Sequence, residues 1–171
     1  MSQTNEVEIM ERIALDLERV EESLASSFNT GAEDFNALIR PLSAAGGKRL
    51  RAQLCLLIAN AGTSIERQRI KIAEAVEMLH LATLIHDDVL DQAEIRRGED
   101  TIHMHKGNKV AILSGDYLFA KAFKIVSEMT NMKYLQVFSH IITCLVEGEF
   151  MQMEDVYLSL IHISEPTRPE R

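Results

Sequence analysis

Apolar side chains recur at three- and four-residue steps through most of this chain, and that spacing constrains the fold more than any other feature. Near the N-terminus the pattern runs from Val7 to Leu24, with acidic residues between its members. Because an α-helix repeats every 3.6 residues, this spacing gathers apolar side chains on one face. No stretch alternates apolar and polar residues as a half-buried strand would. The sequence therefore predicts an all-α fold.

Helix breakers and caps divide this pattern. A short second helix should end at Arg40, since Pro41 lacks the N–H that continuation needs, and a loop should follow over 43–47. Thr63 and Glu66 match a capping box that opens a long helix. That helix is apolar around nearly its whole circumference, which is typical of a helix buried in a bundle. The predicted helices span 7–24, a segment ending at 40, 48–61, 65–91, 110–129 and 134–157.

Composition excludes several classes of protein. The 171 residues are enough for one domain or for a piece of a larger one, and the net charge of -8 argues against nucleic acid as a partner. The two cysteines, Cys55 and Cys144, form neither a disulfide framework nor a zinc signature. No apolar run approaches the roughly 20 residues of a transmembrane segment, and the first residues are acidic where a signal peptide would be basic. We therefore expect a cytoplasmic protein.

The last residues differ from the rest. Segment 158–163 shows no clear helical face, and Ser164–Arg171 is polar and interrupted by prolines, so we expect it to be disordered. The run SLIHISEPTRPER at 159–171 looks like the translation of a sequencing adapter, with a natural disordered tail as the alternative. We therefore expect a partial domain over 1–157 and a non-native tail over 158–171.

An acidic triplet inside the long apolar helix is the strongest chemical signal. Asp87 and Asp91 lie one helical turn apart on the same face, with Asp88 beside them. Such carboxylates repel one another unless cations lie between them, and oxygen ligands of this kind suit Mg²⁺. A solvated acidic helix end is the alternative, but the apolar residues around the triplet argue against it. Asp87 and Asp91 are thus candidate metal ligands.

Two histidines lie close to this triplet. His80 is nearly two turns before Asp87 on the same face, where a hydrogen-bonded core histidine is the alternative to a ligand-binding one. His86 beside Asp87 suggests the His-Asp pair of all-α, metal-dependent phosphohydrolases. That pattern needs further histidines upstream, and the sequence offers only His80 there.

Basic residues form two candidate anion sites. The run Gly46-Gly47-Lys48-Arg49-Leu50-Arg51 joins a loop to a helix, where glycines and helix N–H groups favour an anion. At a spacing of three, Lys48 and Arg51 should share a helix face and could hold one diphosphate. The pair Arg96-Arg97 follows the aspartates and could grip a metal-bound phosphate, with a solvated surface loop as the alternative. Two anion sites flanking a metal-binding face suit a reaction in which diphosphate departs.

Three motifs resemble the N-terminal half of the trans-isoprenyl (polyprenyl) diphosphate synthases, in that family's order. They are GGKRLR at 46–51, LHLATLIHDDVLDQAEIRRG at 79–98 and GDYLFAKAF at 115–123. The resemblance covers about residues 5–157 and is greatest to the catalytic component of enzymes of the heptaprenyl diphosphate synthase kind. It implies an isoprenoid-synthase-type helical bundle and a homo- or heterodimer. It also implies Mg²⁺-dependent, head-to-tail condensation of isopentenyl diphosphate with an allylic diphosphate, giving a medium- or long-chain product.

The resemblance also implies roles for individual residues. Asp87 and Asp91 would bind the Mg²⁺ ions that hold the allylic diphosphate, with Asp88 supporting them and Arg96 contacting that diphosphate. Ala82 and Thr83, one turn before Asp87, would floor the product tunnel, and their small size predicts a product longer than farnesyl diphosphate. The residues implied to hold isopentenyl diphosphate are Lys48, Arg51, His80 and Arg97.

The chain also departs from the family pattern. Members are much longer and carry a second Asp-rich motif and an allylic-site lysine, neither of which occurs in these 171 residues. We therefore expect no prenyltransferase activity from this chain by itself. Two alternatives stay open. A class I terpene cyclase shares the Asp-rich helix but has no use for the GGKRLR site, and a non-catalytic partner subunit tends to lose the aspartates that this chain keeps.

Overall fold

The computed structural model describes residues 3–28, 33–44, 48–62 and 65–163. The chain divides into two compact units, Met1–Thr130 and Asn131–Arg171. The described part of the second unit is dominated by one long helix, α7 (Met132–Ile163). The first unit carries every predicted site residue.

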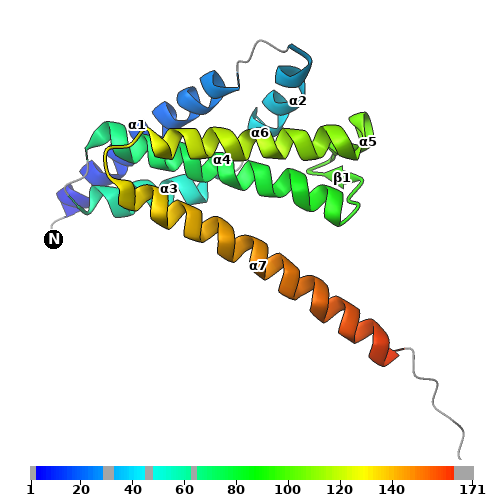
Figure 1. Ribbon diagram of the computed structural model, residues 1–171. Coiled ribbons are helices and arrows are strands. Elements are labelled where there is room, and N and C mark those ends of the chain that lie inside the picture. The colour runs from blue at the N-terminus through cyan, green and yellow to red at the C-terminus, as the bar shows by residue number, and fades with distance from the viewer. Residues whose placement is uncertain (1–2, 29–32, 45–47, 63–64, 164–171) are drawn as a thin grey trace, which may run out of the picture. The chain divides into compact units, whose positions relative to one another are not determined.

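Helices make up nearly all of the first unit, so the predicted all-α class is confirmed (Figure 1). Among the described residues the exceptions are two strands of two residues each. The sequence pattern predicted neither these strands nor the five-residue helix after them. The elements are α1 (Gln3–Ser27), α2 (Glu33–Ala44), α3 (Leu50–Asn60), α4 (Glu66–Leu90), β1 (Ile95–Arg96), β2 (Glu99–Asp100), α5 (Ile102–Lys106) and α6 (Asn108–Ser127).

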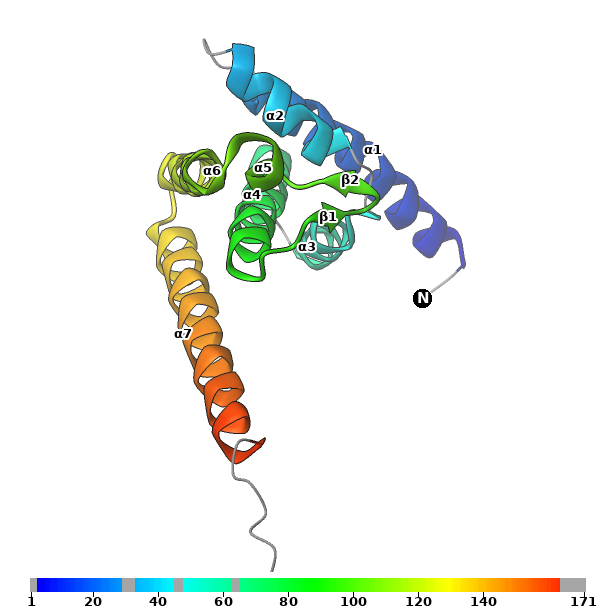
Figure 2. The ribbon, with the colours of Figure 1, turned by 90° about the vertical axis from the view of Figure 1, so that its right-hand side faces the viewer.

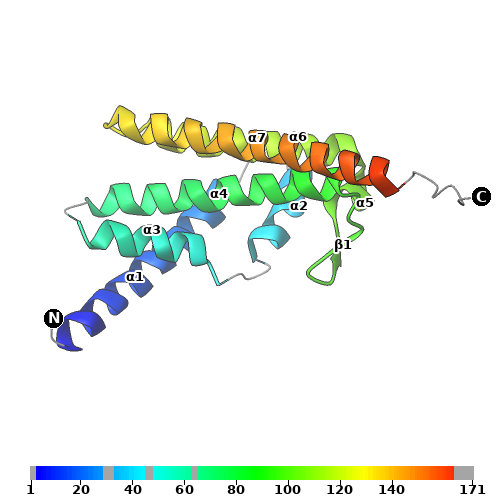
Figure 3. The same ribbon diagram turned by 90° about the horizontal axis from the view of Figure 1, so that it is seen from below.

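The central element of this unit is α4. It packs against α6, α3 and α1, and Figure 2, in which α4 and α6 are seen end-on, shows these neighbours around it. In Figure 3, α3 runs beside the N-terminal part of α4. Burial on several sides explains why the α4 sequence is apolar around most of its circumference. Its buried apolar residues are Ala73, Ala75, Met78, Leu79, Leu81, Ala82 and Ile85.

Buried acids tie α1 to α4. Both oxygens of Asp16, on α1, accept hydrogen bonds from the Arg69 guanidinium, at 2.6 and 3.1 Å. Glu74, fully buried on α4, accepts hydrogen bonds from the hydroxyls of Ser23 and Ser27 at 2.8 and 2.7 Å. Acids are buried only where partners satisfy them. These contacts therefore fix how α1 lies on α4.

The predicted end of the second helix was wrong. Its last turn continues through Pro41 to Ala44. A proline ring fixes φ near the helical value and removes one backbone hydrogen bond, to the carbonyl four residues earlier. That carbonyl belongs to Ala37, whose exposed position lets solvent act as partner, so the helix tolerates the proline.

Several other predicted helix boundaries shift by one or two residues. The third helix begins at Leu50 rather than at Lys48. Residue Thr63 of the expected capping box and the 45–47 part of the expected loop lie outside the described residues. The helix α4 itself begins at Glu66, close to the predicted start.

The last helix runs further than expected. It continues past Tyr157 to Ile163, through the segment predicted to lack a helical face. A helix satisfies its own backbone hydrogen bonds, and no glycine or proline interrupts 158–163. The disorder expected for Ser164–Arg171 falls outside the described residues. Among the described helices, none has a stretch long and apolar enough to cross a membrane.

Candidate active site

The C-terminal end of α4 reverses the chain sharply. The N–H of Ala93 donates to the Asp88 carbonyl at 3.0 Å, and the N–H of Gln92 donates to the Val89 carbonyl at 3.4 Å. Gln92 takes a left-handed conformation, with φ of 53°. These two bonds with a left-handed residue between them form a Schellman motif, which ends a helix and satisfies its last carbonyls.

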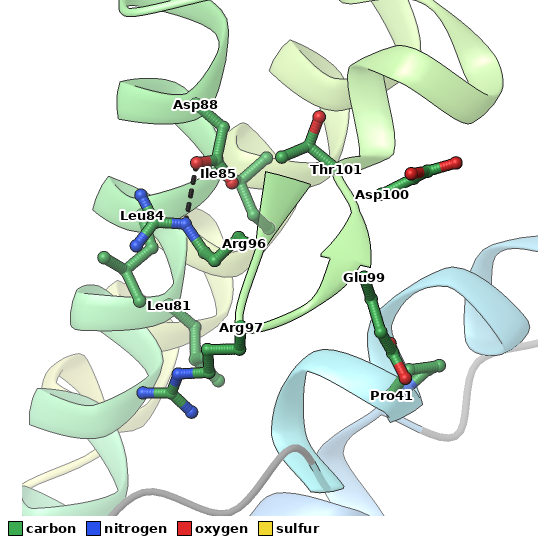
Figure 4. A pocket seen from close by; sticks show the side chains of 10 residues that line it. All are labelled: Pro41, Leu81, Leu84, Ile85, Asp88, Arg96, Arg97, Glu99, Asp100 and Thr101. Atoms are coloured by element: carbon green, nitrogen blue, oxygen red, sulfur yellow. Dashed lines mark hydrogen bonds and ion pairs between the residues drawn. The ribbon is translucent and has the colours of Figure 1, made fainter. Parts of the chain in front are cut away.

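A short hairpin then returns the chain to α4. The strands β1 and β2 pair antiparallel, with Arg96 opposite Glu99, and the turn residues Arg97 and Gly98 both have positive φ, of 55° and 86°. Positive φ at both central residues is the mark of a two-residue type I′ turn. The reversal brings the Arg96 Nε to 2.7 Å from an Asp88 carboxylate oxygen (Figure 4).

The three aspartates therefore have different environments. Asp88 is 6% exposed and ion-paired to Arg96, so it anchors the hairpin. Asp87 is half-buried and Asp91 is exposed, and the Asp91 N–H donates to the Asp87 carbonyl at 2.8 Å, which continues the helical geometry. Asp87 and Asp91 thus follow one another at a full helical turn, as the sequence predicted.

This arrangement fits a metal that needs few protein ligands. Within the described ranges, no three His, Cys, Asp or Glu side chains gather closely enough to hold an ion by themselves. Mg²⁺ keeps several waters and is usually held by one or two carboxylates plus substrate phosphates, rather than by a cage made only of protein. Two carboxylates a turn apart, beside an arginine-bearing hairpin, match that requirement.

A pocket of about 210 Å³ lies between α4 and the hairpin, and we call it the hairpin pocket. Figure 4 shows that its wall is apolar on the α4 side, with the Arg96–Asp88 pair at one end. Both arginines of the predicted basic pair line it. Its residues are Pro41, Leu81, Leu84, Ile85, Asp88, Arg96, Arg97, Glu99, Asp100 and Thr101.

A second pocket of about 210 Å³ lies between the start of α3 and the middle of α4, and we call it the cationic pocket. Four cationic side chains and a single carboxylate line it, in a chain whose net charge is -8. All four residues that the resemblance assigns to isopentenyl diphosphate occur there. Its residues are Lys48, Arg49, Leu50, Arg51, Glu77, His80, Leu81, Leu84 and Arg97.

The prediction that Lys48 and Arg51 share a helix face was nevertheless wrong. They do not share a helix face, because Lys48 precedes α3 and Arg49 turns the chain with φ of 44°. The turn places Lys48 at the same pocket as Arg51 by another route. Gly46 and Gly47, expected to approach an anion, lie outside the described residues.

Burial and neighbouring charge act together on His80. The pKa of His80 is lowered, first by burial and then by the positive charges of Arg51, Arg97 and Arg96, while the Glu77 carboxylate opposes the change. The ring is therefore neutral at neutral pH. An anion entering the cationic pocket would favour the protonated ring. The ring lines the cationic pocket, and this placement is the observation that favours a ligand-binding histidine over a structural core histidine.

Sequence reasoning missed Glu77. It is 4% exposed, and its carboxylate accepts a hydrogen bond from the Ala52 N–H at 3.0 Å and lies 3.5 Å from Arg49 Nη1. An acid within a helix that is apolar all round has to find partners on the packed elements. That rule could have singled out Glu77 before its partners were known.

The side chain of His86 packs against α6. Its Nε2–H donates to the Ile112 carbonyl at 3.1 Å, and the same nitrogen lies 3.5 Å from an Asp116 oxygen. The ring also lies 5.5 Å from that of Phe119. A Cβ at Gly115 would fall 2.2 Å from Nε2, so only glycine leaves room for the imidazole. This accounts for the glycine of the GDYLFAKAF motif and weighs against a phosphohydrolase site at His86.

The two candidate chain-length residues differ in exposure. Ala82 is fully buried, whereas Thr83 is partly exposed and its hydroxyl donates to the His80 carbonyl at 2.8 Å. Thr83 thus keeps accessible surface, whereas Ala82 has none.

Comparison with known proteins identifies the family. A family model described as polyprenyl synthetase matches residues 32–165. The all-trans-nonaprenyl-diphosphate synthase (geranyl-diphosphate specific) of Rhodobacter capsulatus is 40% identical over 148 residues, which cover 78% of this chain and 46% of that protein. Heptaprenyl diphosphate synthase component 2 of Geobacillus stearothermophilus is 38% identical over 143 residues, covering 83% of this chain and 44% of that protein.

Solved structures of similar proteins indicate the same family. Heptaprenyl diphosphate synthase from Staphylococcus aureus superposes with a TM-score of 0.79 at 29% identity, over 84% of this chain and 46% of that one. Polyprenyl synthase from Caulobacter crescentus, solved with calcium and isoprenyl diphosphate, gives a TM-score of 0.79 at 35% identity over 85% of this chain and 44% of that one. The chain therefore belongs to the polyprenyl synthetase family, and it spans less than half the length of these relatives.

Proposed function

We propose that this chain is the N-terminal part of a trans-polyprenyl diphosphate synthase, which joins isopentenyl diphosphate to an allylic diphosphate to give a medium- or long-chain product. The relatives named for nonaprenyl and heptaprenyl diphosphates support this substrate class. One structural observation carries the proposal. The cationic and hairpin pockets are neighbours that share Leu81, Leu84 and Arg97 in their walls. Two diphosphate substrates, one in each pocket, would therefore lie next to each other, with the apolar side chains of Leu81 and Leu84 between the pockets.

The cationic pocket is proposed to hold isopentenyl diphosphate. Lys48 and Arg51 are exposed at its rim, where their charges can reach a diphosphate. Arg97, at the hairpin tip, supplies a third cation to this pocket. His80 lines the same pocket, and an anion bound there would favour its protonated form.

The hairpin pocket and the aspartate face are proposed to hold the allylic diphosphate. Asp87 and Asp91 are the residues that would bind Mg²⁺, and Asp88 holds Arg96 next to them through their ion pair. Mg²⁺ held by these carboxylates would supply Lewis-acid stabilisation of the negative charge on a departing diphosphate. Arg96 would neutralise part of the same charge, and the apolar side chains Leu84 and Ile85 keep water from the reacting carbons.

The proposed reaction breaks one C–O bond and forms one C–C bond. The electron pair of the C–O bond leaves with the diphosphate, and the resulting allylic cation is attacked by the double bond of isopentenyl diphosphate. The departing diphosphate takes up a proton from the new cation, which restores a double bond, and the chain is five carbons longer. No residue of the described chain needs to act as a nucleophile in this scheme.

The complete protein is proposed to be a homo- or heterodimer in the cytoplasm. The relative named component 2 supports a heterodimer. By itself the 171-residue chain is proposed to lack prenyltransferase activity, since it offers one aspartate-rich motif where the family carries two. The chain-terminal segment 158–171 is proposed to be foreign to the enzyme.

Activity of the complete enzyme tests this proposal. The gene is read from source DNA through the codons for 157–171, and the protein that it encodes is incubated with Mg²⁺, geranyl diphosphate and radiolabelled isopentenyl diphosphate. We expect an extended reading frame and labelled products longer than farnesyl diphosphate. Glu128→Gln, an exposed acid at the end of α6, should leave the rate unchanged and serves as a control. A frame that stops after residue 171, or an extended protein without product, would favour a non-catalytic subunit instead.

A further inference from the structure

The buried carboxylate of Glu77 connects α4 to the start of α3 at the edge of the cationic pocket. It is 4% exposed and lies one turn before His80 on the same helix. One of its oxygens accepts a hydrogen bond from the Ala52 N–H at 3.0 Å, and the other lies 3.5 Å from Arg49 Nη1. Both partners belong to the segment that carries Lys48 and Arg51.

The bond to Ala52 gives α3 a cap from outside its own sequence. The first N–H groups of a helix have no partner within the helix, and a side chain just before it usually accepts one of them. Here the residue at the cap position is Arg49, and no side chain of the cap position makes that bond. Glu77 does so from α4 instead. It therefore fixes where α3 begins.

The same carboxylate holds the middle cation of the run. Arg49 is 10% exposed, has a left-handed backbone, and lies between the carboxylates of Glu77 and Glu21, the latter at 3.5 Å. Lys48 and Arg51, on either side of it, are exposed. The Arg49 side chain is therefore held in place by these carboxylates, whereas the side chains of Lys48 and Arg51 are exposed at the pocket.

We propose that Glu77 is the positioning residue of the cationic pocket: through the Ala52 N–H and Arg49 it sets the spacing of Lys48, Arg51 and His80 that a diphosphate requires. This rests on the proposed function of that pocket. Arg49 is accordingly an anchor of the loop and not a ligand of the diphosphate.

Charge alone predicts the opposite effect of losing Glu77. Removal of its carboxylate makes the pocket more positive by one charge, and a more positive pocket attracts an anion more strongly. If Glu77 acts by position, its loss weakens anion binding despite the gain in positive charge. The direction of the change in affinity therefore separates the two roles.

The test measures binding of inorganic pyrophosphate and of isopentenyl diphosphate to the 171-residue chain by calorimetry. We expect Glu77→Ala to weaken both by about tenfold, the effect of one lost charge-assisted contact. Glu77→Gln, which keeps an acceptor for the Ala52 N–H, should weaken binding by a smaller factor. The matched control is Glu74→Ala, an equally buried acid one turn earlier on α4 whose partners are on α1 and Lys71. It should lower the free energy of unfolding and leave the affinity within about twofold.

Hydrogen exchange separates failure of this proposal from failure of the pocket's assigned function. In Glu77→Ala and Glu77→Gln variants with wild-type circular dichroism, we expect the Ala52 amide of the alanine variant to lose protection while amides later in α3 keep theirs. Tighter or unchanged pyrophosphate binding by both variants would overturn the positioning role. A wild-type chain that binds neither probe, with the Ala52 amide exposed by Glu77→Ala, would remove the diphosphate function and leave only a helix cap. An Ala52 amide still protected in Glu77→Ala would overturn the cap itself.

Discussion

Replacement of Gly115 by alanine should destabilise the chain through a single contact, that of α6 with His86. A Cβ at this position would fall 2.2 Å from Nε2 and 2.4 Å from Cδ2 of the imidazole. The ring has little freedom to move away, because it donates to the Ile112 carbonyl and packs against Phe119. Displacing it loses that hydrogen bond and disturbs the packing of α4 on α6.

The expected magnitude follows from opposing contributions. The clash and the lost hydrogen bond together cost about 2–4 kcal/mol. Alanine gains about 1 kcal/mol over glycine in a helix interior. Gly115→Ala should therefore lower the free energy of unfolding by about 1–3 kcal/mol. Urea unfolding followed by circular dichroism at the helical band measures this quantity directly.

A double-mutant cycle supplies the control. In a His86→Ala background the obstructing ring is absent, so Gly115→Ala should be neutral or slightly stabilising there. If Gly115→Ala costs as much without the imidazole as with it, the close approach to His86 is not the cause. A single variant as stable as the wild type would refute the contact as well.

Four further variants test the site. Asp87→Ala in the complete enzyme should lower the prenyltransferase rate by about a thousandfold or more, because a metal-binding carboxylate is lost, and a rate within about tenfold of wild type would refute the metal assignment. Thr83→Phe should shorten the products, separated by chromatography, since Thr83 is partly exposed. An unchanged product distribution would contradict the place of Thr83 at the tunnel. Ala82→Phe should also shorten the products, and it should in addition lower the free energy of unfolding by about 1–3 kcal/mol because Ala82 is fully buried. His80 has a lowered pKa, so the unfolded chain takes up a proton below about pH 6.5 that the folded chain resists, and stability present above that pH is lost as the pH falls. His80→Gln should remove this part of the pH dependence in urea titrations between about pH 7 and 5, and parallel curves for the two proteins would contradict it.

Helical spacing predicted most of the fold because it reports which face of each segment is buried. The long apolar helix became α4, and its burial by α1, α3 and α6 is what its composition indicated. The end of α2 was predicted wrongly at Pro41, since the local rule considers one lost hydrogen bond and not that Ala37, whose carbonyl loses it, is an exposed residue. The hairpin at 95–100 was missed because its strands are only two residues long, too short to show alternation.

The candidate site was predictable where spacing along one helix decides it, as for Asp87 and Asp91. The site was less predictable where contacts between distant segments of the chain decide its geometry. Lys48 lies at the cationic pocket because the chain turns at Arg49, whose left-handed conformation is not predicted by residue propensities. Glu77 was overlooked because its two partners, Ala52 of α3 and Arg49 just before that helix, are far away in the sequence.

The most direct test of the two-site proposal is the metal dependence of ligand binding to the wild-type chain. Isopentenyl diphosphate and geranyl diphosphate are titrated calorimetrically with and without Mg²⁺. We expect isopentenyl diphosphate to bind equally well in both conditions, because cations of the pocket hold it, and to be weakened by Arg51→Gln. Geranyl diphosphate should bind only with Mg²⁺ and should lose that binding in Asp87→Ala. The same metal dependence for both ligands, or binding unaffected by either variant, would contradict two separate diphosphate sites.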